Sequence, residues 1–221
     1  MKKQIFEEYI FYPEDYLKRG YNCLKNGKRE YLFYAALELR CGIEARLREH
    51  LSDMEAVSKS IRNGWQIGFL GKEIEKIFKN RENGYLFNID LKKGSKSIML
   101  LYTPVSLRLQ EIGNRLGDYL HAQKKEYMED DPWWDNFKKL LIEGHEHLAV
   151  AMMGTLTRPP LRNPNTLEIK LSARVNKIDG RRLILALKDG IIKNENILIS
   201  QLRFEYLLSS FQDSSNIFKK L

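Results

Sequence analysis

Hydrophobic side chains recur every three or four positions through much of residues 1–156, which is the spacing of one buried helix face. A first helix is predicted from Pro13, where the fixed φ of proline suits a first turn, to Gly27, which can end it. A second helix is predicted over residues 30–51. Its apolar stripe consists of Leu32, Ala36, Leu39, Ile43, Leu47 and Leu51.

The pattern is less regular between this helix and the middle of the chain. Three glycines, at positions 64, 68 and 71, are expected to interrupt any helix there. A short helix is predicted over residues 73–78. Residues 81–97 contain Asn-Gly and Lys-Gly-Ser turn signals, so we expect a loop or a small hairpin that does not carry the core.

Two later helices are marked by a capping residue followed by proline. Thr103-Pro104 predicts the start of the first and Asp131-Pro132 the start of the second. Each has an apolar stripe that must be covered by another element, and an antiparallel bundle is the simplest way to bury all of them. The stripe residues are Val105, Leu109, Ile112, Leu116 and Leu120, then Trp134, Phe137, Leu141, Leu148 and Met152.

Three prolines within residues 157–165 neither continue a helix nor suit a central strand, so this segment is predicted to link two domains. Over residues 166–221 the hydrophobic period changes to two. Asp179-Gly180 is a hairpin signal, Ile197 and Ile199 indicate a third strand, and a closing helix is expected over 201–211. The predicted fold class is therefore mainly α: a helical bundle, residues 1–156, followed by a small C-terminal α+β module with a short antiparallel sheet.

The composition is that of an ordinary globular protein, with 43% hydrophobic and 30% charged residues in 221. The formal net charge of +8 favours anionic partners such as RNA or other nucleic acid. No apolar run approaches the roughly 20 residues that span a bilayer, and no secretory leader is evident, so a cytoplasmic protein without a membrane partner is expected. With two cysteines and no phosphate-binding or dinucleotide fingerprint, neither a metal nor a cofactor is expected.

The candidate catalytic residues lie on the helix that follows Pro104: Asn114, Arg115 and His121. Residues six apart on a helix differ by about 120°, so Arg115 and His121 cannot lie side by side, whereas Asn114 and His121 share a face. A symmetric dimer would bring two such sets around one phosphate, with Gly117 allowing close helix approach. Histidine can then move protons and arginine can stabilise phosphoryl charge.

This stretch resembles the HEPN superfamily, helical domains whose RNA-cutting members carry an arginine, four to six arbitrary residues and a histidine on a late helix. The resemblance covers about residues 30–156 and includes the earlier helical segment Ala35-Ala36-Leu37-Glu38-Leu39-Arg40. It implies a metal-independent endoribonuclease built across a dimer, serving phage defence or a toxin-antitoxin system, with Arg115 and His121 as catalytic residues. It also implies a protein partner in such a system.

Structural interpretations stand beside these chemical ones. Arg115 can pair with Asp118, with His121 a surface or helix-end residue. His145-Glu146-His147 invites a metal site, but residues two apart on a helix point in different directions, and a packed His145 is the simpler interpretation.

The alternating pattern of the C-terminal module puts Lys170, Arg174 and Arg182 on its outward face, where they are the candidate nucleic-acid-binding residues. A solvated strand face would show the same pattern. Two function classes therefore stay open: a dimeric endoribonuclease, and a non-catalytic helical assembly or adaptor subunit that binds nucleic acid or a protein.

Overall fold

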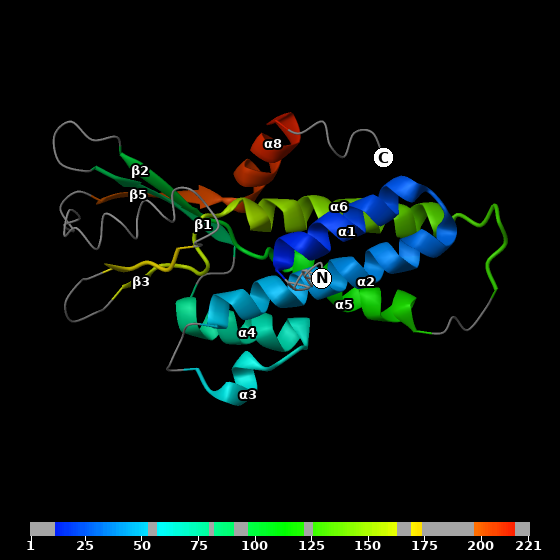
Figure 1. Ribbon diagram of the computed structural model, residues 1–221, viewed down its shortest axis with the longest axis horizontal. Helices are drawn as coiled ribbons and strands as arrows, with labels where there is room; N and C mark the ends of the chain where they lie inside the picture. Colours follow the sequence, from blue (N-terminus) through cyan, green and yellow to red (C-terminus); the bar gives the residue numbers. More distant parts are fainter. Residues whose placement is uncertain are drawn as a thin grey trace, which may run out of the picture.

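The molecule is mainly α, with a helical bundle and a small antiparallel sheet, as the hydrophobic pattern predicted. The computed structural model describes residues 12–52, 57–79, 82–90, 97–121, 126–162, 169–173 and 197–214. The longest helices run alongside one another, and the sheet extends from one end of the bundle (Figure 1). The bundle consists of α1 (Pro13–Asn26), α2 (Arg29–Leu51), α4 (Ile67–Phe78), α5 (Leu107–Leu120) and α6 (Trp133–Met153), with the short α3 (Lys59–Arg62) between α2 and α4.

Helices α1 and α2 have the bounds expected from local signals. Pro13 is the first residue of α1, and the Asp15 carboxylate accepts a hydrogen bond from the Tyr12 amide at 3.3 Å. Gly27 ends the helix with φ at 76°, a left-handed conformation that suits glycine. The apolar stripe of α2 faces the centre of the bundle, where Leu39 and Ile43 are completely buried.

Helix α4 is longer than predicted. It begins at Ile67 and contains Gly68 and Gly71, so the expectation that these glycines interrupt the helix was wrong. Gly71 is buried against α5, and a Cβ placed on it would overlap Oε1 of Gln110. Glycine therefore sits here because α4 and α5 approach closely, a requirement of packing that outweighs its low helix propensity.

The start of α5 also differs from the prediction. The helix begins at Leu107, and Ser106 rather than Thr103 caps it by accepting a hydrogen bond from the Leu109 amide at 3.1 Å. Thr103 and Pro104 are buried before the helix begins. At the start of α6 the prediction was closer: Asp131 accepts a hydrogen bond from the Trp133 amide at 2.8 Å.

A three-stranded antiparallel sheet has the order β2-β1-β5, formed by β1 (Asn83–Ile89), β2 (Ile98–Tyr102) and β5 (Ile197–Arg203). Phe87 is the register partner of both Leu100 and Ile199. One face of the hairpin buries Phe87, Ile89, Ile98, Leu100 and Tyr102 together with Leu156. The expectation that residues 81–97 carry no core was therefore wrong for β1.

The C-terminal residues return to this sheet. β5 pairs with β1, as a third strand near Ile197 and Ile199 predicted, but it pairs with a mid-chain hairpin. The closing helix, α8 (Phe204–Ser214), begins three residues later than expected because β5 extends to Arg203. Phe204 and Leu207 pack with Val150 of α6.

Part of the segment predicted as a linker is paired. β3 (Leu161–Arg162) forms an antiparallel pair with β4 (Ile169–Lys170), and Leu156 bridges to Ala173. The predicted hairpin at Asp179-Gly180 lies outside the described residues. Within the part of the chain that is described, no helix is both long and apolar enough to cross a bilayer.

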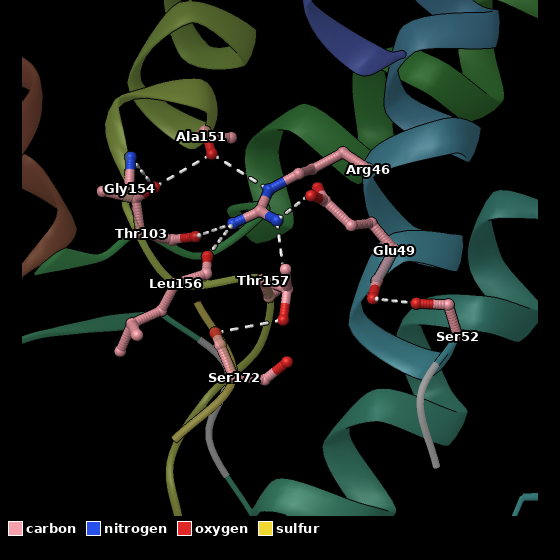
Figure 2. A network of polar contacts seen from close by, with 9 residues as sticks. All are labelled: Arg46, Glu49, Ser52, Thr103, Ala151, Gly154, Leu156, Thr157 and Ser172. Carbon is pink, nitrogen blue, oxygen red and sulfur yellow. Dashed lines mark hydrogen bonds and ion pairs between the residues drawn. The ribbon is translucent and has the colours of Figure 1, made fainter. Parts of the chain in front are cut away.

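A buried arginine joins the bundle to the sheet end of the molecule. The side chain of Arg46, on α2, is completely buried and meets the last turn of α6, the segment that follows α6, and Thr103 just after β2 (Figure 2). Its guanidinium donates to backbone oxygens of Ala151 at 3.0 Å, Thr157 at 2.9 Å, Thr103 at 3.2 Å and Leu156 at 3.4 Å. Glu49 balances its charge through an ion pair of 2.6 Å.

These contacts give hydrogen-bond partners to backbone groups at the C-terminal end of α6. The last carbonyls of a helix have no partner within it and carry partial negative charge. The Ala151 carbonyl accepts from Arg46 and also from the Thr103 hydroxyl at 2.9 Å. The same Thr103 oxygen accepts from the Gly154 amide at 3.1 Å. Thr103, predicted as a helix cap, therefore works at the C-terminus of a different helix.

Candidate functional site

Helix α5 has one buried and one exposed face. Leu109, Ile112 and Leu116 are completely buried in the bundle core. Asn114 and Arg115, between these apolar positions, are exposed to solvent. The two predicted catalytic residues on this helix therefore lie where a substrate or a second protein can reach them.

Asn114 and Arg115 face different neighbours. A Cβ placed on Gly68 of α4 would lie 3.5 Å from the Asn114 side-chain nitrogen, so Asn114 borders α4. The positive charge of Arg115 acts on Glu143 of α6 and helps to lower the pKa of that carboxyl. The two neighbouring positions on α5 thus border different helices, α4 for Asn114 and α6 for Arg115.

His121 lies at the C-terminal end of α5 and not within it. The helix ends at Leu120, and His121 has an extended backbone with ψ at 158°. Its amide donates to the Gly117 carbonyl at 3.2 Å, and its side chain is exposed. The helical periodicity that placed Asn114 and His121 on a common face does not extend to this residue.

The side of α5 that faces α6 carries an ion pair that sequence reasoning missed. Arg108 binds Glu143 through two hydrogen bonds, Nε at 2.6 Å and Nη2 at 2.9 Å. These bonds are the main reason why the pKa of Glu143 is lowered, with added effects from His147 and Arg115. Glu143 therefore stays ionised, and its negative charge attracts Arg108 and Arg115 on this edge of α5.

On the α4 side, Asn114 borders a hollow of about 250 Å³ between α2, α4 and α5. Its walls combine apolar groups with amides and charges, so it could hold a small polar group beside the exposed face of α5. Polar side chains in the lining come from His50, Lys72, Glu75, Gln110 and Glu111. Sequence spacing gave no sign of this hollow, because α2, α4 and α5 are far apart along the chain.

Gly117 packs within the same chain. A Cβ there would lie 3.1 Å from Nη1 of Arg40, a side chain on α2 that also donates to the Gly113 carbonyl at 3.3 Å. The role of Gly117 in a helix crossing between two subunits stays a prediction; within the chain its neighbour is Arg40. Arg40 also forms an ion pair with Glu44, four residues further along α2, with Nε and Oε1 3.3 Å apart.

The paired histidines of α6 have separate packing roles. His145 is completely buried; its Nδ1 lies 2.8 Å from the Leu141 carbonyl, and burial lowers its pKa to about 4. His147 Nδ1 lies 2.9 Å from the Ser106 hydroxyl, and burial lowers its pKa as well. Among the described residues no group of three potential ligands is arranged to hold a metal ion.

Of the three predicted nucleic-acid-binding residues of the C-terminal module, only Lys170 lies in the described part of the chain. Lys170 is the second residue of β4. Arg174 and Arg182 lie outside the described residues. These three positions therefore remain predictions.

Trp133 and Trp134, at the N-terminal end of α6, belong to an aromatic cluster. Trp133 stacks on Tyr127 with ring centroids 4.3 Å apart, and Tyr119 stacks on Phe137 at the same separation. Trp134 donates its indole N–H to the Met128 carbonyl at 3.0 Å. The faces of these rings already contact other rings, which favours a role in packing over stacking on nucleobases.

No family model matches the chain, and comparisons with curated proteins and with solved structures find no similar protein.

Proposed function

We propose that the protein is a HEPN-like, metal-independent endoribonuclease that acts as a homodimer, in a cytoplasmic phage-defence or toxin-antitoxin system. The observation that carries the proposal is the exposed face of α5, with Asn114 and Arg115 open to solvent and His121 exposed at the helix end. His121 is exposed, whereas His50, His145 and His147 are buried, and this difference supports His121 as the catalytic histidine of the proposal.

The proposed reaction is an internal transfer at one phosphodiester. The ribose 2′-oxygen attacks the phosphorus while a histidine takes the 2′-hydroxyl proton, and the bond from phosphorus to the 5′-oxygen breaks. The leaving oxygen receives a proton, and Arg115 stabilises the charge on the phosphoryl oxygens. The products are a 2′,3′-cyclic phosphate and a 5′-hydroxyl, with no water or metal consumed.

The decisive experiment is cleavage of total RNA by the purified full-length protein in EDTA. We expect Arg115→Ala and His121→Ala each to lower the rate by about 10²-fold or more, the size expected for loss of a general acid–base or charge-stabilising group. Arg203→Ala is the matched control, because Arg203 is an exposed arginine on β5. Folded protein that cuts no RNA, or cutting that both variants retain, would overturn the proposal.

A non-catalytic adaptor is the second candidate. It is favoured by the divergence of Asn114 towards α4 and Arg115 towards the Glu143 side of α6. In that case the protein binds RNA or a partner without cleaving it. RNA binding by native gel shift, unchanged in Arg115→Ala and without products, supports this candidate over the nuclease.

A further inference from the structure

A second hollow, of about 650 Å³, lies between the start of α1, the end of α2 and α3. It shares no lining residue with the face of α5, so a binding site there is independent of the proposed nuclease. Three basic side chains line it, one from the last turn of α2 and two from α3: Arg48, Lys59 and Arg62. We call these three residues the basic cluster.

Within the described part of the chain, no carboxylate pairs with the positive charges of the basic cluster. Arg48 acts at a distance on Glu44. Glu49 is the acidic residue in the lining, and Arg46 holds it in an ion pair of 2.6 Å. Among the described residues the hollow therefore presents three positive charges without an ion-pair partner, a condition that favours an anion.

One of these groups is already desolvated. Nε of Arg62 is buried and has no hydrogen-bond acceptor among the described residues. A buried donor without an acceptor costs free energy, so the guanidinium of Arg62 is held at this wall at a cost to stability. Arginine pairs offer planar donors that match phosphate oxygens, which makes phosphate the anion best suited to this site.

The rest of the lining suits a ligand larger than phosphate. Two aromatic rings, those of Tyr12 and Tyr16, stand beside the basic cluster, and Tyr12 is 56% exposed. The Arg19 guanidinium lies 4.6 Å from the Tyr16 ring centroid and covers part of that ring, so Tyr12 is the more accessible surface. Asn63 and Ser52 add polar groups to the wall. Aromatic faces stack well on nucleobases.

We propose that this hollow binds a free nucleoside di- or triphosphate, with the basic cluster on the phosphates and Tyr12 against the base. The volume falls within the range of small-molecule sites. The charge of such a ligand matches the three cations. Discrimination between bases is not implied, since stacking on tyrosine tolerates every base.

Isothermal titration calorimetry on the full-length protein in EDTA tests the proposal. The probes are the adenosine and uridine nucleotides, the two nucleosides, tripolyphosphate and a 5′-hydroxyl RNA oligonucleotide. We expect affinity to rise from mono- to triphosphate and nucleosides not to bind. Arg48→Ala/Arg62→Ala should weaken triphosphate binding roughly tenfold or more, the effect of losing two charge-assisted contacts. Tyr12→Ala should weaken nucleotide binding but not tripolyphosphate binding.

The matched control is Lys18→Ala/Lys139→Ala, which removes the same net charge from exposed positions on α1 and α6. It should change the dissociation constant less than twofold. Equal weakening in both double variants would mean that net charge alone attracts the ligand, and would overturn the proposal. So would binding of the oligonucleotide without binding of any free nucleotide, or no binding at millimolar ligand. Far-ultraviolet circular dichroism of both double variants verifies that they fold.

Discussion

At the scale of single residues, Arg46 shows how much of the fold can depend on one buried cation. Four backbone carbonyls and Glu49 accept from it, and all but Glu49 belong to segments far away in sequence. No sequence pattern predicts this, because backbone carbonyls leave no signature in residue types. Arg40, by contrast, has its ion-pair partner four residues away on its own helix, a spacing that is visible in the sequence.

We expect Arg46→Ala to lower the free energy of unfolding by about 3–5 kcal/mol, because it leaves buried carbonyls and a carboxylate without their cation. Urea denaturation at neutral pH measures the change. Arg48→Ala is the control: Arg48 is exposed two residues further on and should cost about 0.5 kcal/mol or less. Equal losses in the two variants would contradict the role assigned to Arg46.

His145 gives stability a predictable dependence on pH. Burial lowers its pKa from 6.5 to about 4, so the folded protein resists a proton that the unfolded chain accepts. The contribution is complete above pH 6.5 and is lost as pH falls towards 4, by up to about 3 kcal/mol. In His145→Gln the fall in urea midpoint between pH 7 and pH 4.5 should be smaller. Lys139→Ala should leave it as in the wild type, and an unchanged fall in His145→Gln would refute the assignment.

At the scale of elements, the close approach of α4 and α5 rests on Gly71 and Gln110. In Gly71→Ala the new methyl displaces Gln110, whose amide donates to the Val105 carbonyl at 3.0 Å. The loss of that bond, about 1 kcal/mol, offsets a similar gain in helix propensity. In a Gln110→Ala background the same substitution should stabilise by about 1 kcal/mol. A double-mutant cycle by urea denaturation measures the difference, and additive effects would count against the contact.

The elements also show which parts of the fold the sequence could predict. The bounds of α1 follow from Pro13 and Gly27, which act through their own backbone preferences. The first part of α4, residues 67–72, was missed because its glycines are placed by the neighbouring helix. The exposure of Asn114 and Arg115 follows from the apolar period of α5, but the direction of His121 depends on where that helix ends. The two hollows could not be predicted from the hydrophobic pattern, because each is lined by residues from several helices that are separated in the sequence.

At the scale of the whole molecule, the proposed chemistry requires two subunits. Within one chain the Arg115 charge acts towards α6, while His121 sits beyond the last turn of α5. A second copy placed against the exposed face of α5 could supply the missing group to each phosphate. In that arrangement Arg115 of one protomer works with His121 of the partner subunit.

This arrangement predicts complementation between two inactive variants. A dimer of Arg115→Ala with His121→Ala has one site that lacks both groups and one that retains both. When equal amounts are unfolded together and refolded, half of the dimers are mixed, so about a quarter of the wild-type RNA cleavage should return. Each variant refolded alone is the control. If tandem affinity tags show that mixed dimers form and cleavage stays at the level of the single variants, Arg115 and His121 do not cooperate across the interface.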